Sequence, residues 1–516
     1  IGDMIYKRGI EGTWLHWAPG IGAAFYVFII APLWRKSGIL TDLEFLELRF
    51  SGKAAAVLRG FNGLYYSMFW NIMMMAVGIL SITTLMKATT GMDKGLCVLI
   101  TMSGALIYSV VSGIWGVAAT DFMQFFVTVF GSIILAVFAV QAVGGLEPMV
   151  AGIRQMTDWE GHRLNVLPHP GDDLGLPMMT LIYVFTVRWF EHTNYGYFVS
   201  QRLFASKSVK HALLGALVWV AIYWSLIPLP WILTILAAKV HLPELTIGQE
   251  AYPRMAMAVL PVGLKGIFMA SMLAAFMSTF SSLLSWGSSY AINDLYRRFL
   301  VKDASTRHYV VAGQLVMIPM ALIAAAIALY ADTVLQLLFY VLLATTGVYT
   351  VHLGRWIWWR VSAWSEVAAL ASSLFFTLFI CFLIPEWMAK QDLEKYYGHR
   401  MLFVAGASLI VWLVVTFLTP AVDEKVLQEF YKRLKPPGFW GPVRRQLRMP
   451  VSMNLSTIVY YWTIMLMAIF GTLVGLIKLC LGDWVVGGFA SALGLVGIIL
   501  AVIRAVRFQD EELAEQ

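Results

Sequence analysis

The stretch "AAFMSTFSS" (274–282) places several hydroxyl side chains inside a strongly apolar part of the chain. On a helix, small and hydroxyl-bearing residues would form one narrow stripe with Thr279 at its edge; the stripe comprises Ser271, Ala275, Ser278, Ser282, Ser285 and Ser289. One interpretation is close helix packing, in which hydroxyls bond back to carbonyls one turn earlier. The alternative is a site for Na⁺, a hard cation that hydroxyl and carbonyl oxygens can bind and still release.

The segment "TVRWFEHTNYGY" (186–197) brings ionisable side chains into another apolar stretch. Such groups cost at least ~2.5–3.5 kcal/mol each at membrane depth, so Arg188, Glu191 and His192 should face a cavity or one another. Arg188 and Glu191 are spaced i,i+3 and could form an ion pair; a direct role in solute binding is equally supported. Trp189 with Glu191 and His192 suits a sugar or other polyol, whereas an unpaired Arg188 would suit a carboxylate.

Two further groups have both a functional and a structural interpretation. Asp121, in "TDFMQ", is either a carboxylate favoured by the dipole of the helix that it begins or a functional group. Tyr66, Trp70 and Asn71 belong to a polar and aromatic helix face that either lines a solute pocket or packs against a neighbour.

Motifs of enzymes and resident metals are absent from the sequence. The nine histidines are scattered, and H-E-x-x-H, G-x-S-x-G and Walker sequences do not occur. The three cysteines, Cys97, Cys381 and Cys480, lie in or at the ends of separate apolar stretches. We therefore expect no enzyme activity, no cofactor and no metal other than sodium.

Composition defines the elements that must position these residues. Of the 516 residues 59% are hydrophobic and 13% charged, with a mean hydropathy of +0.74. A soluble protein carries about twice that charge, so the sequence predicts an all-α polytopic membrane protein. Thirteen apolar stretches approach the ~20 residues that cross a bilayer: 13–33, 57–86, 95–113, 118–143, 176–200, 211–238, 263–290, 309–330, 333–354, 363–385, 401–419, 455–479 and 485–505.

The basic residues predict the orientation. If the spans alternate, most of the 37 Lys and Arg residues fall on the side that holds the 34–56 loop, which should be cytoplasmic. The chain then starts outside and ends in the cytoplasm, in the plasma or inner membrane of the cell. The basic residues are spread over separate short loops, which argues against nucleic acid as a partner.

The segment 420–452 contains "DEKVLQEFYKRL", an amphipathic helix pattern on the predicted cytoplasmic side. We expect this helix to lie on the anionic membrane surface; docking of a protein partner is the alternative.

Several of these motifs resemble those of one family. "AYPRMAMAVLPVGLKGIFMASMLAAFMSTFSSLLSWGSSYAINDLYRRF" (251–299) resembles the signature region of the sodium:solute symporter family, which includes sodium–sugar and sodium–proline symporters. Four other motifs resemble that family in the same order along the chain: "TDLEFLELRF" (41–50), "GIWGVAATDFMQFFV" (113–127), "GYFVSQRLFASKSVKHA" (196–212) and "TFLTPAVDEKVLQEFYKRLKPPG" (416–438).

The resemblance implies a LeuT-type inverted-repeat transporter fold. By this resemblance residues 1–354 form the transporter core and 355–516 add further C-terminal membrane helices. Stretch 13–33 corresponds to the second core helix, so the first is expected to be missing apart from an outer tail near Ile1 to Tyr6.

The resemblance also assigns roles to residues. The Ala275 carbonyl and the Ser278 and Thr279 hydroxyls are the implied sodium ligands, and Asp121 is placed on the sodium route to the cytoplasm. Trp189 and His192 fall about where the family contacts its solute.

The expected function is sodium-coupled symport of a small organic solute, sugar-like in preference to a carboxylate. The alternatives are a transporter-like membrane sensor or regulator and a membrane-embedded enzyme. The expected partners are Na⁺, the solute and the lipid bilayer; the sequence does not indicate the oligomeric state.

Overall fold

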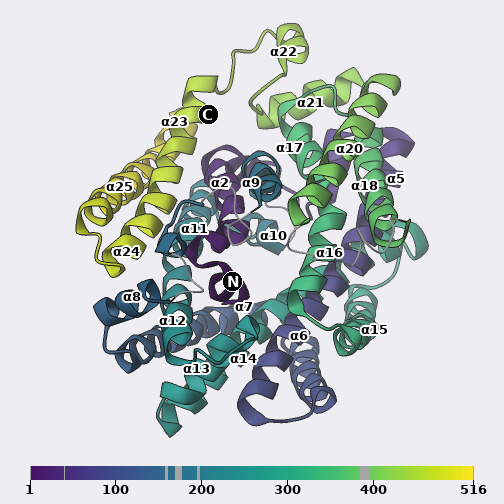
Figure 1. Ribbon diagram of the computed structural model, residues 1–516. Helices are drawn as coiled ribbons and strands as arrows, with labels where there is room; N and C mark the ends of the chain where they lie inside the picture. The colour runs from purple at the N-terminus through teal and green to yellow at the C-terminus, as the bar shows by residue number, and fades with distance from the viewer. Residues whose placement is uncertain are drawn as a thin grey trace. The chain divides into compact units, whose positions relative to one another are not determined.

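The computed structural model describes residues 2–39, 41–156, 161–168, 177–194, 198–383 and 396–514. These residues are almost entirely helical and contain no strand (Figure 1). The chain forms two compact units, each assembled from separate stretches. Unit 1 comprises Ile1–Thr13, Gly60–Leu167 and Leu229–Val341, and unit 2 comprises Trp14–Arg59, Pro168–Pro228 and Leu342–Gln516.

Within the described residues, ten helices are long and apolar enough to cross a membrane, where thirteen spans were expected. The ten are Gly52–Thr90, Ala119–Ala142, Val209–His241, Val262–Leu300, Thr306–Tyr330, Val334–Ile357, Ala363–Phe382, Tyr397–Leu418, Leu455–Cys480 and Trp484–Arg507.

Of the three other expected spans, two are interrupted and one is continuous with the span that follows it. Stretch 13–33 divides at Ile30 into α2 (Trp14–Ile29) and α3 (Ala31–Lys36). Stretches 95–113 and 118–143 are not separated by a loop, because both lie in one continuous helix, α7 (Lys94–Ala142). Stretch 176–200 contains α9 (Met178–Thr186), the tighter turn η4 (Arg188–His192) and α10 (Phe198–Phe204); Tyr195, Gly196 and Tyr197 lie outside the described residues. Hydropathy alone does not reveal these interruptions.

Unit 1 is built around α14 (Val262–Ser289), which packs against α6 (Asn71–Thr90), α7 (Lys94–Ala142) and α15 (Thr306–Tyr330). Small residues let α14 approach its neighbours closely: a Cβ at Gly131 on α7 would collide with Ser271. The Thr128 hydroxyl also donates to the Ser271 carbonyl at 3.2 Å. The other elements of this unit are α1 (Gly2–Arg8), η1 (Ile10–Thr13), η2 (Tyr65–Trp70), α8 (Leu146–Arg154), η3 (Gly161–Leu164), η6 (Gly248–Glu250), α13 (Ala251–Val259) and η7 (Tyr290–Leu300).

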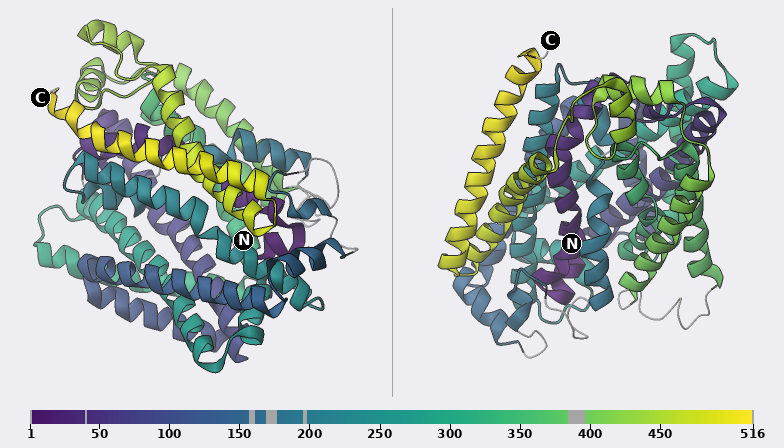
Figure 2. Two further views of the ribbon diagram at one scale, coloured as in Figure 1. Left: turned by 90° about the vertical axis from the view of Figure 1, so that its left-hand side faces the viewer. Right: turned by 90° about the horizontal axis from the view of Figure 1, so that it is seen from above.

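Unit 2 gathers α2, α3, α9, η4, α10 and the C-terminal third of the chain. In this unit α2 packs on η4, α18 (Ala363–Leu378) on α20 (Tyr397–Leu418), and α24 (Thr472–Cys480) on α25 (Trp484–Ala514); α24 and α25 lie side by side in Figure 2. Its remaining elements are α4 (Glu44–Arg49), α11 (Val209–Ala221), η5 (Ile222–Leu226), α17 (Tyr349–Ile357), α18 (Ala363–Leu378), η8 (Phe379–Leu383), α20 (Tyr397–Leu418), α21 (Glu424–Leu434), α22 (Gly441–Leu447), α23 (Leu455–Leu466), η9 (Met467–Gly471), α24 (Thr472–Cys480) and α25 (Trp484–Ala514). The chain passes between units after Thr13 and after Leu167, and also within α5 (Gly52–Leu64), α12 (Pro228–His241) and α16 (Val334–Thr346).

A buried arginine secures the end of α17. Arg49 donates to the carbonyls of Arg355, Trp358, Trp359 and Val361 at 2.9–3.2 Å, which satisfies carbonyls that a helix end leaves unpaired. Its guanidinium also lies 4.9 Å from the centre of the Trp440 ring. Burial lowers the pKa of Arg49 to about 9, with Glu366 acting in the opposite direction.

The amphipathic helix α21 does not present its apolar face to lipid or to a partner. Leu427, Phe430, Tyr431 and Leu434 are all buried, and α21 packs on α4 within unit 2. The expectation of a helix lying with that face on the membrane surface is therefore wrong, because the chain itself covers it.

Substitution of Gly287 on α14 tests how closely α14 packs against α6 and α15. A Cβ at this position would overlap the Asn71 amide nitrogen and lie 2.5 Å from Met320 Cε. We expect Gly287→Ala to destabilise the protein by about 1–3 kcal/mol through overpacking, seen as a lower melting temperature in detergent. Gly266→Ala on the same helix, with nothing within 4 Å of the added Cβ, is the control. Equal melting temperatures for the two variants would contradict the packing described.

Candidate functional site

The hydroxyl stripe of α14 meets a carboxylate from α7. The Ser278 hydroxyl donates to Asp121 Oδ1 at 2.6 Å, and the Ser282 hydroxyl lies 3.5 Å from Asp121 Oδ2. All three residues belong to unit 1 and are half-buried. The structure thus joins the predicted sodium ligand Ser278 to the predicted exit-route residue Asp121.

The other two predicted sodium ligands lie one helical turn apart. The Thr279 hydroxyl donates to the Ala275 carbonyl at 3.1 Å, the local back-bond that hydroxyl residues commonly make in apolar helices. Oxygens at this separation can also face one hard cation, since oxygens coordinate Ca²⁺, an ion of similar size, at roughly 2.3–2.6 Å. The geometry is compatible with both interpretations, and sodium binding at these residues stays a prediction.

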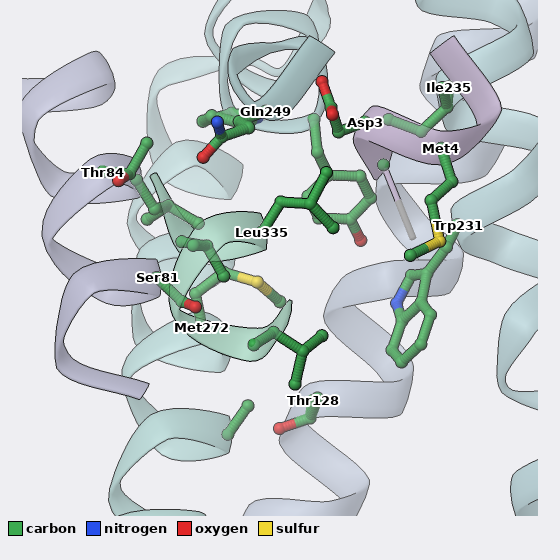
Figure 3. A pocket seen from close by; sticks show the side chains of 17 residues that line it. Asp3, Met4, Ser81, Thr84, Thr128, Trp231, Ile235, Gln249, Met272 and Leu335 are labelled. Carbon is green, nitrogen blue, oxygen red and sulfur yellow. The ribbon is translucent and has the colours of Figure 1, made fainter. Parts of the chain in front are cut away.

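Two cavities in unit 1 share part of their walls, and Ala275 belongs to the shared part. The larger, about 430 Å³, has a polar part that includes Asp3, Ser81, Thr84, Thr128 and Gln249 (Figure 3). The smaller, about 260 Å³, extends along α6 and α14 as far as Thr279. Both are lined by Ser81, Leu85, Met272 and Ala275. Ala275 therefore borders both cavities, and Thr279 borders the smaller one.

Tyr66 and Trp70 on η2 and Asn71 on α6, the residues predicted to bind solute, contact α14. Asn71 is fully buried and its amide donates to the Leu283 carbonyl at 2.7 Å. The Trp70 ring packs edge-on against Trp286 with centroids 5.6 Å apart, and Tyr66 lies 6.4 Å from the same ring. These contacts give each residue a structural role, while a role in solute binding is still a prediction.

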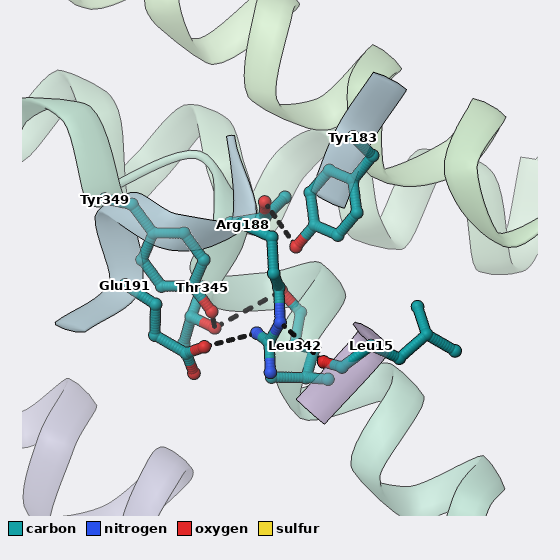
Figure 4. Close-up of polar contacts among 8 residues, drawn as sticks. Leu15, Tyr183, Arg188, Glu191, Leu342, Thr345 and Tyr349 are labelled. Atoms are coloured by element: carbon teal, nitrogen blue, oxygen red, sulfur yellow. Dashed lines mark hydrogen bonds and ion pairs between the residues drawn. The ribbon is translucent and has the colours of Figure 1, made fainter. Parts of the chain in front are cut away.

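In unit 2, Arg188 and Glu191 form an ion pair with 2.5 Å between nitrogen and oxygen (Figure 4). The Arg188 side chain is 9% exposed and that of Glu191 20%. The Arg188 Nε also faces the Leu15 carbonyl at 3.5 Å. The i,i+3 pairing interpretation is therefore confirmed as a structural contact.

Tyrosines and threonines surround this pair. The Thr346 hydroxyl donates to Tyr183 at 3.2 Å, and Thr345 and Tyr349 share a hydrogen bond of 2.9 Å. The sequence pattern does not mark these residues, since isolated Tyr and Thr residues in apolar helices carry no periodic signal.

Trp189 and His192 lie within aromatic clusters. The Trp189 ring stacks on Phe190 with centroids 4.0 Å apart and lies 5.3 Å from Trp462. His192 lies 5.5 Å from Trp224. A side chain at Gly22 would collide with the Trp189 carbonyl, so α2 approaches η4 backbone to backbone. Both rings are only partly exposed.

Comparison with known proteins identifies the class. One solved structure, of a Na⁺-coupled sialic acid symporter in a substrate-bound outward-open state, matches with a TM-score of 0.61, covering 82% of this chain and 88% of that one. At 19% identity this likeness concerns the fold alone, which is the LeuT-type transporter fold. The chain is thus a polytopic helical membrane protein of transporter architecture.

The sequence comparisons identify the family. The profile of the sodium:solute symporter family matches residues 1–355. A sodium/glucose cotransporter of Vibrio parahaemolyticus is 25% identical over 81% of this chain and 79% of its own length. An uncharacterized symporter, YidK, of Escherichia coli (strain K12) is 27% identical over 81% of this chain and 74% of its own length. The chain belongs to the sodium:solute symporter family, whose members are transporters and whose coupling ion is Na⁺.

The Arg188–Glu191 pair makes a specific prediction. Removing one partner of a buried pair leaves an uncompensated charge, which costs about 3–5 kcal/mol, whereas removing both does not. We expect Arg188→Gln alone to reduce folded yield and thermal stability more than Arg188→Gln combined with Glu191→Gln. Equal or additive losses in the two variants, measured as melting temperature and monodisperse yield, would indicate independent roles.

Proposed function

We propose that this chain is a sodium-coupled symporter that imports a small organic solute by alternating access. Inward movement of Na⁺ supplies ~2.3 kcal/mol per charge for each 100 mV of membrane potential, in addition to its concentration gradient. The proposal rests on membership of the family together with the Ser278–Asp121 hydrogen bond, which is the observation that carries it.

The proposed sodium ligands are the Ala275 carbonyl and the Ser278 and Thr279 hydroxyls. A hydroxyl that donates its proton to a carboxylate keeps its oxygen lone pairs for another partner. Because Ser278 donates to Asp121, its oxygen is oriented as an acceptor, which favours a cation beside it. The other two oxygens lie within 3.1 Å of each other on the same helix.

In this proposal the ion moves from its three ligands to Asp121. A carboxylate oxygen about 5 Å from a cation attracts it by roughly 3 kcal/mol at an effective dielectric constant of 20, enough to guide the ion without trapping it. The second Asp121 oxygen points toward Ser282, which supplies a further oxygen one turn along α14. In this proposal the ion moves along a row of side-chain oxygens, which belong to Thr279, Ser278, Asp121 and Ser282.

The proposed solute is sugar-like. Glu191 already neutralises Arg188 at 2.5 Å, which disfavours a carboxylate-bearing solute at this guanidinium. Trp189 and His192, with partly exposed rings, supply the stacking surface and hydrogen-bonding group that a polyol requires. A carboxylate solute remains the alternative if the ion pair opens during transport.

We propose the cell membrane as the location, with the chain starting outside and ending in the cytoplasm. The distribution of Lys and Arg among the loops supports this orientation.

The sodium assignment is tested by single substitutions in the full-length protein. Loss of one ligand oxygen should weaken sodium binding by about 1.5–3 kcal/mol, or roughly ten- to hundredfold. Ser278→Ala or Thr279→Ala should therefore raise the Na⁺ concentration needed for half-maximal uptake, and the double variant should nearly abolish coupled uptake. Uptake into proteoliposomes over a series of Na⁺ concentrations provides the measurement.

Ser285→Ala is the matched control, because it removes a hydroxyl from the same helix and stripe two turns from Ser278. Its sodium dependence should stay unchanged. Ser282→Ala should have an intermediate effect, since Ser282 faces Asp121 at 3.5 Å. If all four variants lower expression alike and leave sodium dependence intact, the hydroxyls serve only helix packing and the assignment fails.

The orientation is tested by cysteine accessibility. In a variant lacking Cys97, Cys381 and Cys480, a membrane-impermeant thiol reagent added outside whole cells should label Glu244→Cys and leave Lys207→Cys unlabelled. Both positions are exposed and lie in loops expected on opposite sides. The reverse labelling pattern would overturn the topology.

A further inference from the structure

Asn194, the second residue after η4, is held by two tryptophan side chains. The Trp34 indole donates to the Asn194 carbonyl at 2.8 Å, and the Trp356 indole donates to the Asn194 side-chain oxygen at 2.7 Å. These donors stand 160 residues before and 162 residues after Asn194 in the chain. The end of η4 is thus tied to α3 and to α17, all within unit 2.

The chemistry of the indole fixes the direction of these bonds. An indole N–H can only donate, so the Asn194 side-chain atom that faces Trp356 is its oxygen. Asn194 has 4% of its surface exposed, and Trp34 and Trp356 have none. An acceptor that loses its partner in such surroundings bears the full cost of desolvation. The position of Asn194 is therefore well defined.

The two indoles are themselves fixed by their neighbours. The Trp34 and Trp356 rings meet edge-on with centroids 4.9 Å apart, and Phe45 lies 4.4 Å from the Trp356 ring. The Trp440 indole, in the segment after α21, donates to the Trp356 carbonyl at 2.8 Å. Phe45 and Trp440 are buried as well. Donors ordered in advance lose little entropy when they hold their acceptor.

The support of η4 comes from its two ends. Its five residues form a single tight turn, which has poorer hydrogen-bond geometry than an α-helix and does not continue into one. Near its start, a side chain at Gly22 of α2 would collide with the Trp189 carbonyl, so the two backbones touch. At its end stands Asn194. The direction of the turn, and with it that of Glu191 and His192, depends on these two contacts.

We propose that Asn194 is a positioning residue for solute binding. Through the bond from Trp356 it fixes the end of η4, and so the arrangement in which Trp189, Glu191 and His192 meet the solute. Asn194 does not touch the solute and acts only through η4. This role rests on the proposed function, in which those three residues contact a sugar-like solute.

Trp356→Phe in the full-length protein tests this role, because it removes the indole N–H and keeps an aromatic ring beside Trp34 and Phe45. Loss of a buried hydrogen bond changes an equilibrium constant roughly five- to tenfold, so the solute concentration for half-maximal uptake should rise by that factor. The maximal rate should change by less than about twofold. The probe is radiolabelled glucose or galactose, whichever the wild-type protein takes up faster into proteoliposomes at saturating Na⁺.

Sodium binding measured without solute should be unchanged in this variant, because the proposed sodium ligands belong to unit 1. Asn194→Ala removes the acceptor of the same bond and should raise the half-saturating solute concentration to a similar extent. Because the two changes remove one bond, the double variant should lie within about twofold of the larger single effect. If melting temperatures show that Trp356→Phe does not fold, Asn194→Ala alone gives the test.

Trp358→Phe is the matched control. It makes the same chemical change two residues along the chain, where the ring packs on Trp412 and Phe417. Among the residues that the structure describes, the Trp358 indole nitrogen has no hydrogen-bond partner. Its half-saturating solute concentration should stay within about twofold of the wild-type value.

Three results would overturn the role of Asn194. Lower melting temperatures with unchanged half-saturation in Trp356→Phe or Asn194→Ala would mean that the network only stabilises the fold. An equal rise in Trp358→Phe would indicate a general response to the loss of a tryptophan. Additive effects in the double variant would mean that the two residues act separately. Failure of the proposed function looks different, since the wild-type protein itself would then show no sodium-dependent uptake of either sugar.

Discussion

A polar group surrounded by lipid or by apolar side chains must find its partner within the chain, and this constraint organises both units. An unpaired buried charge costs several kcal/mol, and three buried or half-buried charges show how specific donors or acceptors avoid that cost. Asp121 accepts from Ser278, and Arg188 pairs with Glu191. Arg49 donates to four backbone carbonyls. At the candidate sodium and solute sites, the polar groups that pair with one another within the chain can also bind an ion or a solute in place of that partner.

Close approach of helices makes these partnerships geometrically attainable. Lipid chains are as apolar as the helices they surround, so packing of small residues has to hold the helices together. In unit 1, Gly131 on α7 lies against Ser271 on α14, and Gly287 admits the side chain of Asn71. The first of these contacts brings α7 near enough for Asp121 to reach the hydroxyl stripe. Packing and polar pairing are therefore two aspects of one helix interface.

The interruption at η4 needs support of its own, because a broken helix leaves backbone groups that lipid cannot satisfy. Asn194, just beyond η4, supplies part of it: its carbonyl accepts from the Trp34 indole at 2.8 Å and its side chain accepts from Trp356 at 2.7 Å. Trp440 donates to the Trp356 carbonyl at 2.8 Å, which extends this network to the segment after α21. The break that carries Arg188 and Glu191 is in this way anchored to the C-terminal part of unit 2.

Local patterns in the sequence determined the membrane class, the hydroxyl stripe of α14 and the pairing of Arg188 with Glu191. Each of these follows from hydropathy or from spacing within one helical turn. Other features depended on contacts between residues far apart in the chain. Asp121 and Ser278 are 157 residues apart, and the apolar face of α21 is covered by α4. The helix breaks within stretches 13–33 and 176–200 are features that hydropathy does not detect. Helical periodicity states which face a residue lies on, but only the packing of helices decides what that face meets.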